Sequence, residues 1–98
     1  MDVTRVVDDI LNKLLDNGFE EEDIVTSERN NLGYLDVLTM DSNCTETPWR
    51  IYVIPTEIIF TKVTVFNGIS EIEMLETFQD ESSFLSFLDK QINHTEEE

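Results

Sequence analysis

The side chains of this chain that could do chemistry are almost all carboxylates. Residues 18–25 read GFEEEDIV, so four acids follow one another with no cation beside them. Carboxylates can transfer protons, bind Ca²⁺ or Mg²⁺, or pair with the cations of a partner. A calcium loop alternates its ligands around a sharp central turn, and this run has neither feature. We therefore predict no metal site and no cofactor.

The chain offers little for nucleophilic catalysis. Cys44 is the only cysteine and His94 the only histidine, and His94 lies in a polar C-terminal segment. A catalytic thiol or serine needs a base beside it, which this arrangement does not supply. The three glycines are isolated and form no phosphate-binding loop. The sequence predicts a protein that is not an enzyme, with an acid–base pair among the many carboxylates as the open alternative.

The charge of the chain is its most unusual property. Twenty-two acids face six bases, which gives a formal net charge of −16. Small domains designed for solubility carry a net charge of about 2–8 in magnitude, and a larger imbalance destabilises the compact state by self-repulsion. Six scattered bases make no footprint for phosphates, so we predict no direct binding of nucleic acid.

The first element that must position these acids is an amphipathic helix at the N-terminus. Asp2 or Thr4 can cap its start, and Asn17-Gly18 supplies a left-handed stop. Apolar residues recur at helical spacing and predict one buried stripe, made of Val3, Val6, Val7, Ile10, Leu11, Leu14 and Leu15.

A second amphipathic helix is predicted near the C-terminus. Asp80 or Ser82 can cap it, and its apolar positions are Phe84, Leu85, Phe87, Leu88 and Ile92. Residues 94–98 read HTEEE and are predicted to form a disordered acidic tail. Residues 1–93 then make a single domain.

Strand patterns fill the segment between the helices. They cover residues 24–26, 32–40, 49–54, 57–66 and 69–78, and Asn67-Gly68 is the strongest hairpin signal. Consecutive strands joined by short turns pair antiparallel, and helices at both ends can pack on the sheet. We predict an α+β fold: an antiparallel sheet of four to five strands with an N-terminal and a C-terminal helix packed on one face.

The turn at Asn67-Gly68 also predicts a register and a buried face. Phe66 should lie opposite Ile69, and the pairs further along should be Val63–Ile72, Lys62–Glu73 and Phe60–Leu75. The more uniformly apolar side is predicted to face the core, and it consists of Val63, Val65, Ile72 and Met74. With both helices on one face, apolar residues on the other face would lie bare, and a homodimer would cover them.

The acids predicted to bind a partner fall into two ranks. Acids two positions apart on a strand lie about 6.6–6.8 Å apart on one face, close to the spacing of phosphates along a DNA strand. Glu71 and Glu73 have this sequence spacing. The first rank is Glu20, Glu21, Glu22, Asp23, Glu71, Glu73 and Glu76, and the second is Asp36, Asp41, Asp80 and Glu81.

In size, charge, lack of enzymatic motifs and α+β organisation the chain resembles the small acidic DNA-mimic inhibitors that phages encode. Such proteins act on host nucleases, restriction systems, CRISPR effectors or nucleoid proteins. The resemblance implies that the protein occludes the basic DNA- or RNA-binding groove of a host protein by steric and electrostatic means. The encounter would then be fast and weakened by salt. The class shares no motif, so no residue role is carried over from it.

Two alternatives come from other classes. A small acidic chaperone, similar to those of type III secretion, would grip apolar segments of a partner, and that binding would survive high salt. An immunity protein would bind one cognate toxin. A third possibility is an acidic domain without such a partner. The N-terminal residues lack a basic segment before their apolar run, and no stretch is apolar enough to cross a membrane. The expected location is the cytoplasm of a host bacterium.

Overall fold

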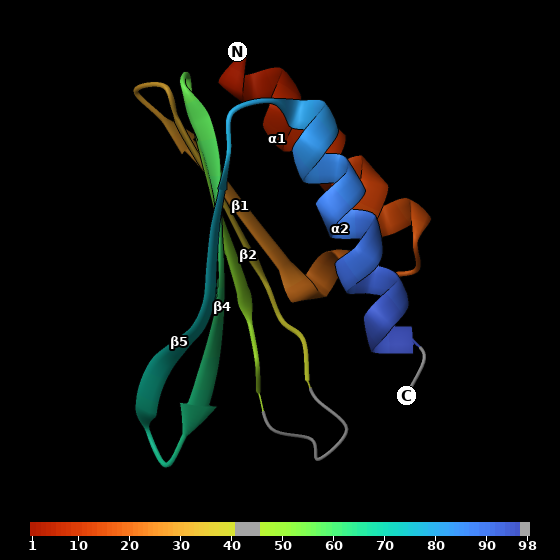
Figure 1. Cartoon of the computed structure of the whole chain (residues 1–98), viewed down its shortest axis with the longest axis vertical. Coiled ribbons are helices and arrows are strands. Elements are labelled where there is room, and N and C mark those ends of the chain that lie inside the picture. The colour runs from red at the N-terminus through yellow and green to blue at the C-terminus, as the bar shows by residue number, and fades with distance from the viewer. Residues whose placement is uncertain (41–45, 97–98) are drawn as a thin grey trace.

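Two helices and five strands make up the computed structural model, which describes residues 1–40 and 46–96. The elements are α1 (Val3–Asp16), the short 3₁₀ helix η1 (Glu21–Asp23), β1 (Ile24–Arg29), β2 (Leu32–Val37), β3 (Trp49–Ile54), β4 (Glu57–Phe66), β5 (Ile69–Phe78) and α2 (Glu81–Glu96). Both helices lie on the same side of the sheet (Figure 1). The predicted α+β fold is confirmed, with five strands.

The sheet is a simple meander in which every neighbouring pair is antiparallel. Its order is β1-β2-β3-β4-β5, so β1 and β5 are the two edges. Asn30 and Asn31 adopt φ values of 52° and 62°, and Asn67 and Gly68 adopt 52° and 77°. Positive φ at both central residues is the signature of a type I′ turn, whose twist matches that of the strands. The predicted turn at Asn67-Gly68 is confirmed.

Helix α1 is closed at both ends by local hydrogen bonds. The Asp2 carboxylate accepts from the backbone N–H of Arg5 at 3.3 Å, so Asp2 is the cap. Gly18 adopts φ +93°, and the N–H of Phe19 donates to the carbonyl of Leu14 at 3.1 Å. This left-handed ending turns the chain back so that Phe19 packs on the core.

Helix α2 is capped by Asp80, one of the two residues predicted to cap it. The Asp80 carboxylate accepts from the N–H of Ser83 at 2.7 Å and from the Ser83 hydroxyl at 3.1 Å. The helix ends at Glu96 and thus includes residues 94–96 of the predicted acidic tail, while residues 97–98 lie outside the described part of the chain. Lys13 of α1 and Asp89 of α2 form an ion pair of 2.8 Å between the two helices.

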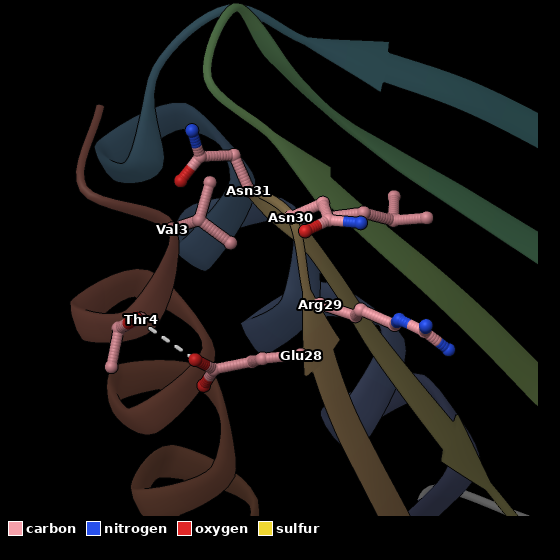
Figure 2. Close-up of a pocket in the computed structure, with 7 residues that line it drawn as sticks. Val3, Thr4, Glu28, Arg29, Asn30 and Asn31 are labelled. Carbon is pink, nitrogen blue, oxygen red and sulfur yellow. Dashed lines mark hydrogen bonds between the residues drawn. The ribbon is translucent and has the colours of Figure 1, made fainter.

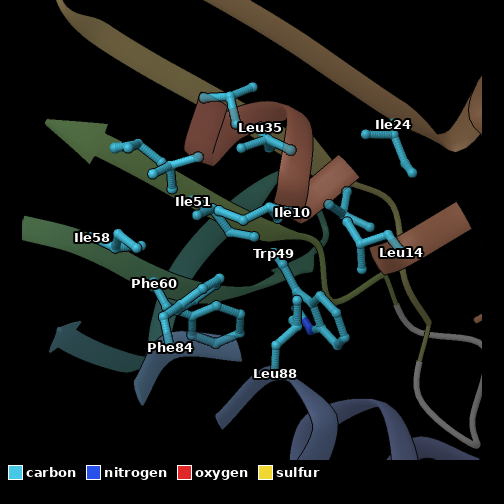
Figure 3. Packing of buried hydrophobic residues seen from close by; sticks show 14 of the residues in the cluster. Ile10, Leu14, Ile24, Leu35, Trp49, Ile51, Ile58, Phe60, Phe84 and Leu88 are labelled. Carbon is cyan, nitrogen blue, oxygen red and sulfur yellow. The ribbon is translucent and has the colours of Figure 1, made fainter. Parts of the chain in front are cut away.

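The core lies between the helices and one face of the sheet (Figure 3). Phe60 of β4 is fully buried, with its ring centroid 5.7 Å from Trp49 of β3 and 5.0 Å from Phe87 of α2. Gly33 of β2 lies directly beneath α1, where an added Cβ would overlap the side chain of Val7. The other buried members of the cluster are Val3, Val6, Ile10, Leu14, Ile24, Leu35, Val37, Ile51, Val53, Ile58, Phe84, Leu88 and Ile92.

The predicted hairpin register is right near the turn and wrong beyond it. Phe66 lies opposite Ile69 and Val63 opposite Ile72, as predicted. Past Val63 the register shifts by one residue because a bulge leaves Glu73 without a partner. Lys62 therefore lies opposite Met74, and the other shifted pair is Phe60–Glu76.

The predicted core face of the hairpin is wrong for β4 and for Ile72, although Val63 is buried and Met74, which lies past the bulge, packs against the core. The core takes the face of β4 that carries Ile58 and Phe60, whereas Val63 pairs with the exposed Ile72 on the opposite face. The reason lies in β2 and β3, whose inward positions are uniformly apolar and must share a face with their partners in β4. Within β3 these positions are Trp49, Ile51 and Val53, and they align with Lys62, Phe60 and Ile58.

Candidate functional site

The first-rank acids form two groups at opposite edges of the sheet. Residues 20–23 precede β1 and include η1, and all but the half-buried Asp23 are exposed. Glu71, Glu73 and Glu76 are exposed on β5, the other edge. In the described part of the chain no ion pair reaches either group, since the pairs found are Lys13–Asp89 and Arg50–Asp36. The structure therefore does not bring the two groups together.

The bulge in β5 changes the expected acidic row. Regular alternation would have placed Glu71 and Glu73 on one face two residues apart. Because Glu73 is the residue without a partner, that alternation is interrupted between the two glutamates. The phosphate-like spacing predicted for this pair therefore does not follow from the strand as it is built.

A second-rank acid joins the first group on the face of the sheet that the helices leave uncovered. Asp36 of β2 lines a hollow together with Glu22 and Asp23, and Glu46 completes its acidic lining. The remaining lining residues are Val25, Leu38, Pro48, Arg50 and Val65. The hollow thus crosses from β1 to β4, and both apolar side chains and carboxylates line it.

Glu46 was not among the acids predicted to bind a partner, because it lies outside the segments predicted to form strands. The N–H of Val65 donates to the carbonyl of Glu46 at 3.1 Å, and the N–H of Val63 donates to that of Pro48 at 3.0 Å. Residues 46–48 therefore continue the line of β3 along β4. The alternation of Glu46, Pro48 and Arg50 was the available signal.

The uncovered face as a whole is rich in apolar side chains. We call it the open face. The register places on it Val25, Ser27 and Arg29 of β1, Leu32, Tyr34 and Asp36 of β2, Arg50, Tyr52 and Ile54 of β3, Glu57, Ile59, Thr61, Val63 and Val65 of β4, and Ser70, Ile72, Leu75 and Thr77 of β5, with Leu38 just past β2. Several are strongly exposed, including Val25 at 60%, Ile72 at 63% and Leu75 at 56%. No helix lies against this side in Figure 1.

The middle of the open face is partly polar. Tyr34 and Tyr52 lie on neighbouring strands with ring centroids 5.5 Å apart. Asp36 Oδ1 lies 3.8 Å from Nε of Arg50 on the facing strand. Burial, and then the charge of Asp36 and a hydrogen bond to it, raise the pKa of the Tyr34 hydroxyl. These contacts fix the side chains beside the hollow.

Two of the remaining second-rank acids make contacts within the chain. Asp80 caps α2, and its hydrogen bonds from Ser83 lower its pKa. Glu81 is half-buried beside Asp9 of α1, and burial followed by the hydrogen bond and the negative charge of Asp9 raises its pKa. Asp41 lies outside the described residues. Glu81 therefore contacts Asp9 inside the domain, whereas Asp80 keeps an exposed carboxylate while it caps α2.

Two further hollows border the sheet. One lies at the β1–β2 turn beneath the start of α1, where the Thr4 hydroxyl donates to Glu28 at 2.8 Å (Figure 2). Its polar groups hold the turn against the helix. The other lies at the tip of the β4–β5 hairpin and is lined by Thr64, Phe66, Ile69 and Glu71.

Two other classes of site were sought in the described ranges, 1–40 and 46–96. No cluster of three or more His, Cys, Asp or Glu residues suited to a metal ion occurs there. Neither helix there combines the length and apolar character required to cross a membrane. A comparison with protein-family models, with curated proteins and with solved structures gave no match.

Proposed function

We propose that this protein binds the basic nucleic-acid-binding surface of a host protein and occludes it, acting as an acidic mimic of DNA. The observation that carries the proposal is the net charge of −16 together with the exposure of all first-rank acids but Asp23, none of which is used in an ion pair within the described residues. Unpaired carboxylates on a folded surface attract a basic groove at long range and repel nucleic acid.

The partner that fits this surface is a nuclease, a restriction or CRISPR effector, or a nucleoid protein. The site of action is the cytoplasm of a host bacterium. The acids at residues 20–23 and at β5 lie at opposite edges of a domain whose longest axis is 37 Å. Duplex DNA carries a phosphate about every 3.4 Å on each strand, so a domain of this size can stand in for roughly one helical turn.

The test is a pull-down from a bacterial lysate with the protein as bait. We expect a DNA-binding protein that is retained at low salt, released at about 0.5 M salt because the charges are screened, and displaced by duplex DNA. Retention that is insensitive to duplex DNA would contradict occlusion of a nucleic-acid site.

Charge reversal locates the contact. Glu20→Lys, Glu21→Lys and Glu22→Lys together should weaken binding of the captured protein by roughly a hundredfold or more, since each reversed rim charge costs about 1 kcal/mol or more. Asp8→Lys and Asp16→Lys on α1 are the control for changed net charge. Equal losses per reversed charge in the two sets would mean that only net charge matters.

The open face favours a second candidate, a small acidic chaperone or immunity protein. Exposed apolar residues on one face of a sheet mark a protein-binding surface. A partner held there by apolar contact would stay bound through the high-salt wash and would not be displaced by duplex DNA.

A further inference from the structure

The open face is one side of a two-layer domain, and several of its apolar residues are exposed within the described chain. A sheet that is apolar on both faces is stable in water when each face is packed against another element. Here α1 and α2 supply one layer, and Val25, Leu38, Ile72 and Leu75 are left 42–63% exposed on the other side. Residues 1–40 and 46–96 thus form two layers, without a third.

We propose that a basic amphipathic helix of a partner protein docks in the open-face hollow and supplies that layer. The proposal rests on the proposed function and names the surface and the kind of segment through which the partner binds. Apolar side chains of the helix would lie on Val25, Leu38 and Val65, and its lysines and arginines would meet Glu22, Asp23 and Glu46.

The dimensions of the hollow fit one helix. Its lining runs from β1 through β2 and β3 to β4, which are adjacent in the sheet. Neighbouring strands lie about 4.8 Å apart, so three intervals span about 14 Å, and a helix with its side chains is about 10–12 Å across.

The charges around the hollow select a basic occupant. Four of its lining residues are acids, and Arg50, its one basic lining residue in the described chain, already lies against Asp36. A positive helix therefore gains attraction on both sides of its apolar stripe.

The same charges disfavour a second copy of this chain. A two-fold contact through the open face would place this patch against itself, with acids of one copy near those of the other. Each copy also carries a net charge of −16, and like charges across an interface cost several kcal/mol.

The probe is a synthetic helical peptide with leucines on one face and lysines on the other. Its control is a peptide of the same composition, shuffled so that no apolar face forms. Binding is measured by fluorescence anisotropy, and the contact is mapped by amide chemical shifts. We expect the amphipathic peptide to bind at least about tenfold tighter than the shuffled one, with the largest shifts at Val25, Leu38 and Val65.

Two matched sets of variants separate the hollow from general acidity. Glu22→Gln, Asp23→Asn and Glu46→Gln together should lower peptide affinity about tenfold. Glu71→Gln, Glu73→Gln and Glu76→Gln together remove the same charge from the far edge and should change affinity less than about twofold. Val25→Ser with Leu38→Ser should remove the preference for the amphipathic peptide, and both side chains are exposed enough to be replaced without opening the core.

Three results would overturn the proposal: equal binding of the two peptides, equal loss in the two acidic sets, or a stable dimer in sedimentation whose interface covers the open face. The outcome is separable from that of the proposed function. Capture of a DNA-binding protein that is displaced by duplex DNA, yet is insensitive to the hollow variants, would leave the function standing and refute the docking site. If the peptide binds in the hollow but no such DNA-binding protein is captured, the docking site would stand and the proposed function would be refuted.

Discussion

The two faces of the sheet are built from the same strands but differ in how far their apolar side chains are buried. On the covered face, Leu35, Ile51 and Phe60 are fully buried under α1 and α2. On the open face, Val25, Ile72 and Leu75 are each more than half exposed to water. Apolar burial drives folding at roughly 25 cal/mol per Å², so the covered face supplies most of the stability. The open face leaves apolar surface available for a partner.

Truncation of one large side chain on each face gives the widest contrast. Phe60→Ala should lower the free energy of unfolding by about 3–5 kcal/mol, because it removes a fully buried ring that contacts Trp49 and Phe87. Ile72→Ala on the open face should cost less than about 1 kcal/mol, since the side chain is 63% exposed. Urea unfolding followed by the fluorescence of Trp49, the one tryptophan, measures both. Equal costs would mean that the open face is packed in solution.

A second contrast concerns how closely a helix approaches the covered face. Gly33→Ala should destabilise the fold by about 1–3 kcal/mol, because the new Cβ would overlap Val7 of α1. Val7→Ala makes room, so the double variant should be less destabilised than the sum of the two single ones. The matched change on the open face of the same strand, Asp36→Ala, meets no helix. A purely additive double-mutant cycle would show that α1 does not rest on Gly33.

The parts of this contrast that are encoded locally could be predicted from the sequence. The caps at Asp2 and Asp80 and the turn at Asn67-Gly68 depend on residues within a few positions of each other. The bulge at Glu73 and the choice of core face depend on how long strands align with neighbours and on where the helices end. No local pattern carries that information.

The candidate site shows the same division. The acids at residues 20–23 were evident as a run, and their exposure is set by η1 and the start of β1. The hollow is lined by Val65 of β4, by Glu46 and by Asp36 of β2. These residues lie far apart in the sequence, and only the order of strands in the sheet brings them together. Glu81 looked like a free surface acid, whereas packing of α2 on α1 places it against Asp9.

The salt dependence of stability should distinguish the contribution of the apolar core from the repulsion among the surface acids. At about 0.01 M salt the Debye length is about 30 Å, comparable with the 37 × 27 × 24 Å domain, so acids at both edges repel each other. Raising NaCl to about 0.5 M should increase the free energy of unfolding by on the order of 1 kcal/mol, or roughly 4–8 °C in Tm. Calorimetry measures the shift. The combined variant Glu20→Gln, Glu21→Gln and Glu22→Gln should show a smaller one, and a Tm that falls with salt would contradict the repulsion.

The smallest predicted effect lies between the two helices of the covered side. The pKa of Glu81 is raised above its ordinary value of 4.5 by burial and by Asp9, so the folded state holds this proton more tightly than the unfolded state does. This contribution to stability is complete below pH 4.5 and is lost as the pH rises through the raised pKa. Relative to Glu81→Gln, the wild type should therefore lose stability over that window, by less than about 1 kcal/mol because the pair is partly solvated. Urea unfolding at a series of pH values measures the difference, and the exposed Glu76→Gln controls for the loss of one charge. If the wild type instead gains stability relative to Glu81→Gln as the pH rises, then Arg5, and not Asp9, dominates the environment of Glu81.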